Sequence, residues 1–223
     1  MINNKTILAI TLARGGSKGI PKKNIVDING KPLLQYTINE VKKSKYVDKY
    51  VISTDDEEIF DLCHKNEVST IDREEAGDTQ SSAVGLLEVL KYSCEYDYVI
   101  EIMCTNPLKS VEDIDGVIKK LDETKADSVV SVVRIWDNHP SRVKYIENDR
   151  LIDFYSEPPE SRRQDLTPPA YVRNGSIYGM TFEQLNIKKQ RLGKDTRPYI
   201  MSEERTINID EPRDLELARI MLK

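Results

Sequence analysis

The first 135 residues alternate between short apolar runs and amphipathic stretches, and this alternation constrains the fold more than any other feature of the chain. Runs rich in β-branched and apolar residues are typical of strands buried on both faces, and they occur at 6–13, 49–54, 98–103 and 127–135. Stretches with apolar residues at helical spacing separate them, at 31–44, 55–66, 81–96 and 111–123. Strands that alternate with helices predict crossover connections, and therefore an α/β fold whose mainly parallel central sheet is flanked by helices.

The pattern changes between residues 136 and 180. Two short strand-like runs, 141–146 and 150–155, flank a polar turn. A stretch rich in Pro and Arg at 156–175 predicts a long ordered loop, and a strand signal follows at 176–180.

After residue 195 the alternation returns, with apolar runs at 197–201 and 205–210 and a closing helix at 211–223. A chain of 223 residues fits one domain, or one domain with a sizeable insertion. We therefore expect a single domain over 1–223 with an insertion at about 136–180, which would serve as a dimerisation or lid element.

Composition and charge argue against several classes of protein. The net charge of −5 argues against a general nucleic-acid binder, so the positive charge near the N-terminus is a local feature. Three cysteines, an odd number without metal-ligand spacing, are typical of a reducing compartment. No segment is long and apolar enough to span a membrane, and the N-terminal apolar run is too short for a signal peptide. We expect a cytoplasmic protein with neither nucleic acid nor membrane as a partner.

A glycine-rich basic stretch, LARGGSKGIPKKN at 12–24, follows the first predicted strand. In open parallel sheets ligands bind at the carboxyl ends of the strands, and a glycine-rich turn there exposes backbone N–H groups to an anion. Gly15, Gly16 and Gly19 allow close backbone approach or a positive φ. The cations that would neutralise a triphosphate are Arg14, Lys18, Lys22 and Lys23. The stretch matches neither G-x-G-x-x-G nor G-x-x-x-x-G-K-[ST], so it predicts an anion site of another kind, and the alternative is a solvated basic turn.

The stretch LARGGSKGIPKKNI, followed by NGKPLLQYTI, resembles the acylneuraminate cytidylyltransferases, the CMP-sialic acid synthetase family. Further blocks resemble the family in the same order, from residue 7 to about 219, namely VISTDDEEI, GDTQSS, TNPLKS, NHPSR, RRQD, RNGSIY, RPYIM and INIDEPRDLELA. The resemblance implies an enzyme that transfers CMP from CTP to the anomeric hydroxyl of a nine-carbon 2-keto sugar acid and releases pyrophosphate. It also implies a Rossmann-like nucleotidyltransferase domain with an inserted dimerisation element, a homodimer, and a role in cell-surface polysaccharide biosynthesis.

The resemblance further implies which residues bind the nucleotide. In this reaction the protein mainly positions groups and stabilises charge, and the implied catalytic residues are Lys18, Arg14 and Asp210. The loop after the first strand would hold the triphosphate, and the stretch DREEAGDTQSS the base and ribose. The nucleotide-binding residues are Arg14, Gly15, Gly16, Ser17, Lys18, Lys23, Asn24, Arg73, Asp78, Thr79 and Ser82. The motif STDD at 53–56 lies in the same region, but it is at least as typical of a helix cap with an acidic first turn.

The family resemblance implies Mg²⁺ as a cofactor, with Asp210 in the block INID as a ligand. Mg²⁺ prefers hard oxygen donors, keeps several waters and takes only one or two carboxylates. Many relatives have IDID here, whereas this chain has Asn208 at the first aspartate, and an amide oxygen offers a ligand without a charge. We expect Asp210 and Asn208 to be metal ligands at the end of a strand. The alternative for Asp210 is the N-cap of the closing helix.

The carboxylate of a sugar acid calls for an arginine, whose planar fork binds it with two hydrogen bonds. The candidates are Arg142, Arg163 or its neighbour Arg162, and Arg173, and the alternative for each is a solvated surface charge. The resemblance adds the block NG-x-IY and the stretch after the strand at 98–103. The implied acceptor-binding residues are Met103, Thr105, Arg142, Arg163, Arg173, Asn174, Gly175 and Tyr178.

The block EIMCTNPLKS departs from the family pattern, because Met103 and Cys104 replace a glutamine and a proline and Lys109 replaces an arginine. A thioether in place of an amide removes a polar contact near the acceptor. The acceptor stays open among N-acetylneuraminate, legionaminate and similar nonulosonates, and the departures favour the less hydroxylated ones. We expect Cys104 to pack rather than react, since no His–Cys pairing is visible.

Two other hypotheses stay open. One keeps the fold and CTP but changes the acceptor. The other is a non-catalytic protein that binds a nucleotide or a sugar acid; Asn208 and Met103 favour it, whereas Lys18, Asp210 and the block RNGSIY, all intact, oppose it.

Overall fold

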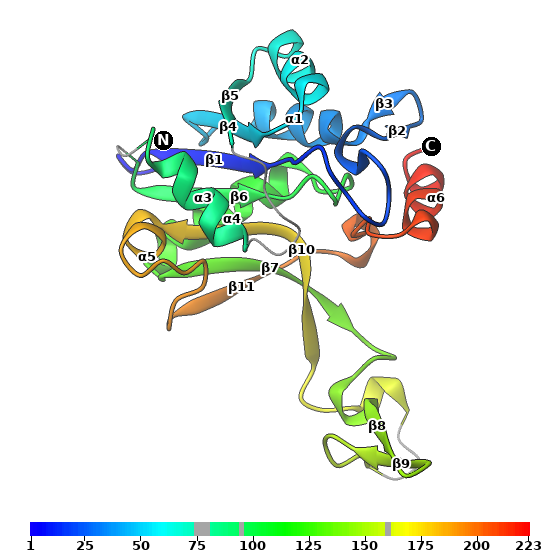
Figure 1. The fold of residues 1–223 in the computed structure, drawn as a ribbon. Coiled ribbons are helices and arrows are strands. Elements are labelled where there is room, and N and C mark those ends of the chain that lie inside the picture. Colours follow the sequence, from blue (N-terminus) through cyan, green and yellow to red (C-terminus); the bar gives the residue numbers. More distant parts are fainter. Residues whose placement is uncertain (74–80, 94–95, 159–161) are drawn as a thin grey trace.

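A computed structural model describes residues 1–73, 81–93, 96–158 and 162–223 of the chain. At its centre lies a seven-stranded sheet with the strand order β11-β7-β10-β6-β1-β4-β5 (Figure 1). The strands are β1 (Ile7–Leu12), β4 (Lys49–Thr54), β5 (Ser69–Asp72), β6 (Tyr98–Ile102), β7 (Ser128–Ile135), β10 (Ala170–Thr181) and β11 (Thr196–Ile200). Neighbouring strands are parallel except for β10, which runs antiparallel to both β6 and β7. The predicted α/β fold with a mainly parallel sheet is confirmed.

Helices cover both faces of the sheet, because the buried strands present apolar residues on both sides. In β1, Ile7 and Ala9 pack in one apolar cluster with α4, and Leu8 and Ile10 pack in another with α3. The helices are α1 (Leu33–Lys43), α2 (Glu57–Lys65), α3 (Ser82–Leu90), α4 (Val111–Thr124), α5 (Phe182–Asn186) and α6 (Pro212–Met221). Among the described residues, no helix has both the length and the apolar character needed to cross a membrane.

A small hairpin of β2 (Asp27–Ile28) and β3 (Lys31–Pro32), which the sequence pattern did not predict, follows the basic loop, the part of the glycine-rich stretch that comes after β1 (residues 13–24). Ile28 of the hairpin packs with Leu215 and Ala218 of α6. The hairpin and the last helix therefore lie side by side, as Figure 1 shows for β2 and α6.

Residues 205–210 do not form the expected strand, so the prediction that Asp210 ends a strand is wrong. Ile207 and Ile209 are buried and Asn208 is exposed, so apolar and polar residues alternate in the sequence as they do in a half-buried strand. The backbone of this segment is held by the Ile209 N–H, which donates to the carbonyl of Thr105 at 2.9 Å, rather than by a ladder of strand pairing.

Strand β10 begins earlier than expected, at Ala170. The last six residues of the predicted loop over 156–175 therefore belong to this strand. Tyr171 and Arg173 pair with β7, and a register shift follows between Arg173 and Tyr178. The first part of β10 is exposed, and its polar and proline-rich surroundings hide the strand in the sequence.

Between β7 and β10 the described residues 136–158 and 162–169 leave the sheet as an arm, which projects far from it (Figure 1). The arm carries β8 (Lys144–Glu147) and β9 (Arg150–Asp153), which pair antiparallel as the two short strands predicted around a polar turn. The expected insertion at 136–180 corresponds to this arm together with most of β10, which lies inside the sheet.

Candidate active site

The basic loop leaves the carboxyl end of β1 and is packed tightly on both sides. A Cβ atom on Gly15 would lie 2.5 Å from Oδ2 of Asp56, and one on Gly19 would overlap the carbonyl oxygen of Asp210. The Gly15 N–H donates to Oδ1 of Asp55 at 2.7 Å. Close backbone approach is therefore what requires glycine at these two positions, whereas the space around Gly16 is open.

The motif STDD contains both a helix cap and a contact to the basic loop. Asp56 is the N-cap of α2 and accepts from the Ile59 N–H at 3.1 Å, which confirms the capping interpretation. Asp55, the preceding residue, holds the basic loop through Gly15. The motif thus fixes the loop against the end of β4.

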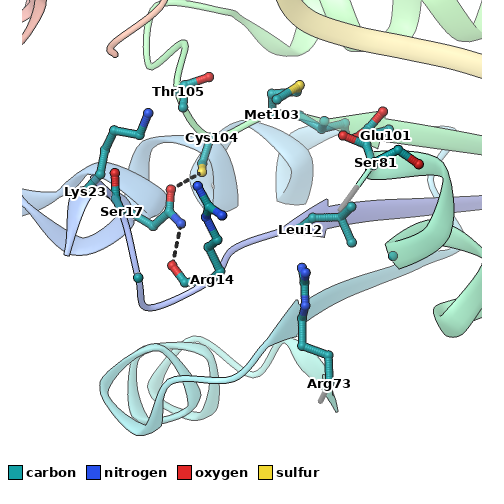
Figure 2. Close-up of a pocket in the computed structure, with 15 residues that line it drawn as sticks. Leu12, Arg14, Ser17, Lys23, Arg73, Ser81, Glu101, Met103, Cys104 and Thr105 are labelled. Carbon is teal, nitrogen blue, oxygen red and sulfur yellow. Dashed lines mark hydrogen bonds between the residues drawn. The ribbon is translucent and has the colours of Figure 1, made fainter. Parts of the chain in front are cut away.

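A first cavity of about 240 Å³ opens at the carboxyl ends of β1 and β6 (Figure 2). The structure brings predicted nucleotide-binding residues together around it, namely Arg14, Gly16, Ser17, Lys23, Asn24, Arg73 and Ser82. Two predicted acceptor-binding residues, Met103 and Thr105, line it as well. Arg14, Ser17 and Lys23 lie near one end and Arg73 near the other (Figure 2). The spacing suits an elongated ligand with an anionic end.

Four predicted nucleotide-binding residues are not among the residues that line this cavity. Gly15 supports the loop, and Lys18 is an exposed side chain on it. Asp78 and Thr79 lie outside the described residues. The role of Lys18 stays a prediction.

Asn24 joins the basic loop to the end of β6. Its amide nitrogen donates to the carbonyl of Arg14 at 2.8 Å, and its amide oxygen accepts from Sγ of Cys104 at 2.9 Å (Figure 2). Burial raises the pKa of the Cys104 thiol, so the protonated form donates this hydrogen bond. These contacts agree with the packing role expected for Cys104. In this structure the Asn24 amide positions the backbone of the loop.

Asp210 and Asn208 form an exposed corner beside the cationic end of the first cavity. The Asp210 carboxylate accepts from Nζ of Lys23 at 2.9 Å and, through its other oxygen, from the Asn208 amide. Glu211, not Asp210, is the N-cap of α6, so the capping alternative for Asp210 is wrong. Asp214 accepts the backbone N–H groups of Asp210 and Glu211, and these hydrogen bonds lower the pKa of its carboxyl.

This corner fits Mg²⁺ by the chemistry of its donors. One carboxylate and one amide oxygen are hard ligands, and Mg²⁺ commonly takes its remaining ligands from water and substrate phosphate. Across the described ranges, no group of three or more His, Cys, Asp or Glu side chains forms a complete metal cage. A metal at Asp210 and Asn208 would therefore depend on oxygens that the protein does not supply.

A second cavity of about 390 Å³ lies where β10 shifts its register, next to residues 206–208. It is lined by Arg173, Asn174, Gly175 and Tyr178 from the predicted acceptor set, and by Asn208. Gly175 has a φ of +61°, and a Cβ there would lie 3.3 Å from Oδ1 of Asn208.

The side chain of Asn174 is directed into the protein. It accepts from the Ser131 hydroxyl at 2.7 Å, and its nitrogen lies 3.1 Å from Sδ of Met201 and 3.3 Å from the Thr206 hydroxyl. Asn174 therefore ties β10 to the segment that carries Asn208.

Arg142 and Arg163 lie on the arm and line neither cavity. Nε of Arg142 lies 3.5 Å from Glu157, and Nη1 of Arg163 lies 3.3 Å from Asp137. Of the three predicted carboxylate-binding arginines, only Arg173 reaches a cavity within the described chain.

Comparison with known proteins agrees with this geometry. The sequence model of the family described as "Cytidylyltransferase" matches residues 8–221. The chain belongs to the cytidylyltransferase family. Pseudaminic acid cytidylyltransferase of Campylobacter jejuni is 30% identical over 97% of this chain and 96% of its own length. N-acylneuraminate cytidylyltransferase of Escherichia coli O18:K1:H7 is 29% identical over 95% of this chain and 51% of its own length. The predicted resemblance is confirmed.

A solved structure supports the fold of this cytidylyltransferase. CMP:2-keto-3-deoxy-manno-octonic acid synthetase complexed with CTP superposes with a TM-score of 0.75, covering 97% of this chain and 98% of the other, at 21% identity. At that identity the likeness establishes the nucleotidyltransferase architecture.

Two buried ionisable residues of this family member were not among the predicted site residues. Glu101 is 2% exposed, lines the first cavity and pairs with Arg191 at 2.7 Å. Lys109 is also 2% exposed, and its ammonium donates to Thr37, to the carbonyl of Met103 and to that of Asn106. The sequence held one signal for Glu101, a carboxylate inside the apolar run YVIEIM. Its partner is 90 residues away, and no local pattern identifies it.

Proposed function

We propose that the protein transfers CMP from CTP to the anomeric hydroxyl of a nine-carbon 2-keto sugar acid and releases pyrophosphate. The observation that carries the proposal is the convergence of Arg14, Ser17 and Lys23 at one end of a cavity in a chain of the cytidylyltransferase family. Its relatives pseudaminic acid cytidylyltransferase and N-acylneuraminate cytidylyltransferase support, by the substrates in their names, a nonulosonic acid as the acceptor.

In the proposed reaction the anomeric hydroxyl releases its proton to water and its oxygen forms a bond to the α-phosphorus of CTP, while the bond from that phosphorus to the bridging oxygen of pyrophosphate breaks. Negative charge increases on the leaving group, and cations fixed in advance stabilise it most effectively. Arg14 and Lys23 line the cavity where this charge would develop. Lys18, exposed on the same loop, is proposed to contact the triphosphate from outside.

Mg²⁺ is part of the proposal, with Asp210 and Asn208 as the residues that would hold it. When bound, the ion would supply positive charge to the triphosphate and help to orient it. Lys23 donates to Oδ1 of the same carboxylate, so this lysine would lie beside the bound metal.

A homodimer formed through the arm is also proposed. The arm exposes apolar side chains that a single chain leaves in water, including Ile146, Leu151 and Phe154. It also carries Arg142 and Arg163, whose acceptor-binding role would require the arm to meet another copy of the site. A cytoplasmic location is proposed because CTP is available there, and the product would supply cell-surface polysaccharide synthesis.

The test is to incubate the purified protein with CTP, Mg²⁺ and one acceptor at a time from a panel of N-acetylneuraminate, legionaminate, pseudaminate and a shorter keto-acid sugar, and to measure pyrophosphate. We expect release with at least one acid, and far better turnover of CTP than of ATP or GTP. Equal use of purine nucleotides would contradict the assignment. Release only with a shorter keto-acid sugar would favour a different acceptor, and binding without release would favour the non-catalytic hypothesis.

A further inference from the structure

Arg191 lies at the point where the two cavities approach each other. It lines the second cavity, while its ion-pair partner Glu101 lines the first. Nη1 of Arg191 is 2.7 Å from Oε2 of Glu101. The guanidinium also lies over the ring of Tyr178, 4.5 Å from the ring centroid. Two contacts from different directions therefore hold this arginine in one orientation.

The Glu101 carboxylate is itself firmly placed. Glu101 sits within β6 opposite Tyr178 of β10, and the residue is 2% exposed. Burial raises the pKa of this carboxyl, while the ion pair with Arg191 and a hydrogen bond with Ser82 act in the opposite direction. A buried ion pair stabilises a fold little compared with apolar side chains of similar volume. The pair does, however, fix the position of a guanidinium at the wall of a cavity.

The fixed guanidinium keeps donors for a ligand. Arginine has five N–H donors in a rigid planar fork. Within the described part of the chain, Glu101 engages Nη1 and Tyr178 covers one face. These two contacts do not use the other N–H groups of Arg191. The side chain lines the second cavity and is partly exposed, so these groups can serve a ligand there.

The second cavity has the composition of an anion site. The described residues that line it include Arg173 and Arg191 and no aspartate or glutamate. Its remaining polar groups include Asn208 and Thr206, and Val133 and Ile207 provide apolar wall. A planar anion attached to a larger, partly apolar molecule matches these groups, and a carboxylate binds an arginine fork in two-point fashion.

We propose that Arg191, oriented by Glu101 and Tyr178, binds the carboxylate of the acceptor in the second cavity. This assignment rests on the proposed function and names a residue for its acceptor that the sequence pattern did not identify. Arg191 is thus a specificity-determining residue, and Glu101 is a positioning residue that acts through it. A cavity adjoining the nucleotide cavity is also where an acceptor would need to lie to reach a phosphorus atom.

The test compares each nonulosonic acid of the panel with its methyl ester, which keeps the sugar and removes the negative charge. Binding is measured by calorimetry with CTP present and no divalent metal, so that turnover does not interfere. The parent should bind the acid at least about 10-fold more tightly than the ester, the scale of one charged hydrogen-bonded contact. Arg191→Lys keeps a cation beside Glu101 but loses the fork, and it should lose most of this preference. Arg197→Ala, which removes an exposed arginine paired with Asp195, is the matched control and should keep it.

Three results would overturn the inference. In the first, Arg191→Lys keeps the parental preference for the acid. In the second, Arg173→Ala abolishes the preference and Arg191→Lys does not. In the third, the parent binds acid and ester equally. Glu101→Gln should reduce the preference only partly, whereas a general structural defect would weaken the binding of acid and ester alike. If the protein prefers the acid through Arg191 but releases no pyrophosphate, the proposed function is refuted and the inference is supported. If it releases pyrophosphate but shows no preference for the acid, the proposed function is supported and the inference is refuted.

Discussion

The ammonium of Lys23 lies 2.9 Å from Oδ1 of Asp210, so a residue after the first strand is joined to one just before the last helix. The other oxygen of the same carboxylate accepts from the Asn208 amide. A metal ion that binds Asp210 would share the carboxylate with these two partners, because an ionised carboxylate has further lone pairs on both oxygens. Because Lys23 also lines the first cavity, its release from Asp210 would make its charge available to a phosphate there.

Asp210→Ala should lower pyrophosphate release by at least about 10²-fold, because it removes the carboxylate proposed to hold the metal and leaves Lys23 without its partner. The measurement is the turnover number at saturating CTP and acceptor. Asp61→Ala, on the exposed surface of α2, is the control and should behave like the parent. Parental turnover by Asp210→Ala would refute the metal assignment.

Asn208→Asp should lower the Mg²⁺ concentration that gives the half-maximal rate. An amide offers only an oxygen dipole to the ion, whereas a carboxylate offers a full negative charge, which Mg²⁺ prefers. The effect should be smaller than that of Asp210→Ala. If the variant releases pyrophosphate with any nonulosonic acid and the parent does not, the non-catalytic hypothesis is favoured for the natural chain.

Lys18→Ala should reduce turnover by roughly 10²-fold, the scale for losing one preorganised donor. Lys18 is exposed, so the midpoint of thermal unfolding should remain that of the parent. Lys65→Ala, another exposed lysine at the end of α2, serves as the control for a general loss of positive charge. Near-normal turnover by Lys18→Ala would remove this lysine from the catalytic set.

Strands β1, β4, β6 and β7 were predictable because they are mostly buried, which makes them continuous apolar runs. The edge strand β5 was not predicted, because it is short and only half-buried. Part of the nucleotide end of the site was predictable because residues 14–24 are contiguous in the sequence and directly follow β1, although Asp55, Cys104 and Asp210 also hold them in place. The segment 205–210 misled because buried Ile207 and Ile209 alternate with exposed polar residues in the absence of strand pairing.

The acceptor side was less predictable because distant parts of the chain build it. Arg142 and Arg163 fit the chemistry of a carboxylate, but the sequence does not reveal that their segment leaves the sheet as an arm. Arg191 lies in a polar stretch after α5, and only the fold brings it to Glu101 and Tyr178. Contacts of this kind depend on tertiary packing and leave no local pattern.

Lys109 predicts a specific dependence of stability on pH. Burial lowers the pKa of its ammonium to about 7, below the ordinary lysine value of the unfolded chain. The unfolded state therefore binds more protons than the folded state between about pH 7 and pH 10, and in this window the free energy of unfolding rises with pH. Relative to Lys109→Met, the parent should gain stability by about 1 kcal/mol per pH unit across it, measured by urea unfolding at several pH values. A constant difference between the two proteins would show that Lys109 stays charged throughout.

The arm predicts the oligomeric state. Ile146 of β8 and Leu151 of β9 are paired across the hairpin and are 75% and 74% exposed. If this surface joins two copies, Ile146→Asp places an unpaired charge in an apolar contact. The cost of about 3 kcal/mol or more corresponds to over 100-fold in the dissociation constant.

Light scattering after gel filtration should show a dimer for the parent and a monomer for Ile146→Asp at the same concentration. Ile220→Asp, which changes an isoleucine of α6 that is 65% exposed, is the matched control and should stay dimeric. A parent that is monomeric at micromolar concentration would refute a stable dimer, and an Ile146→Asp dimer would move the contact away from the hairpin.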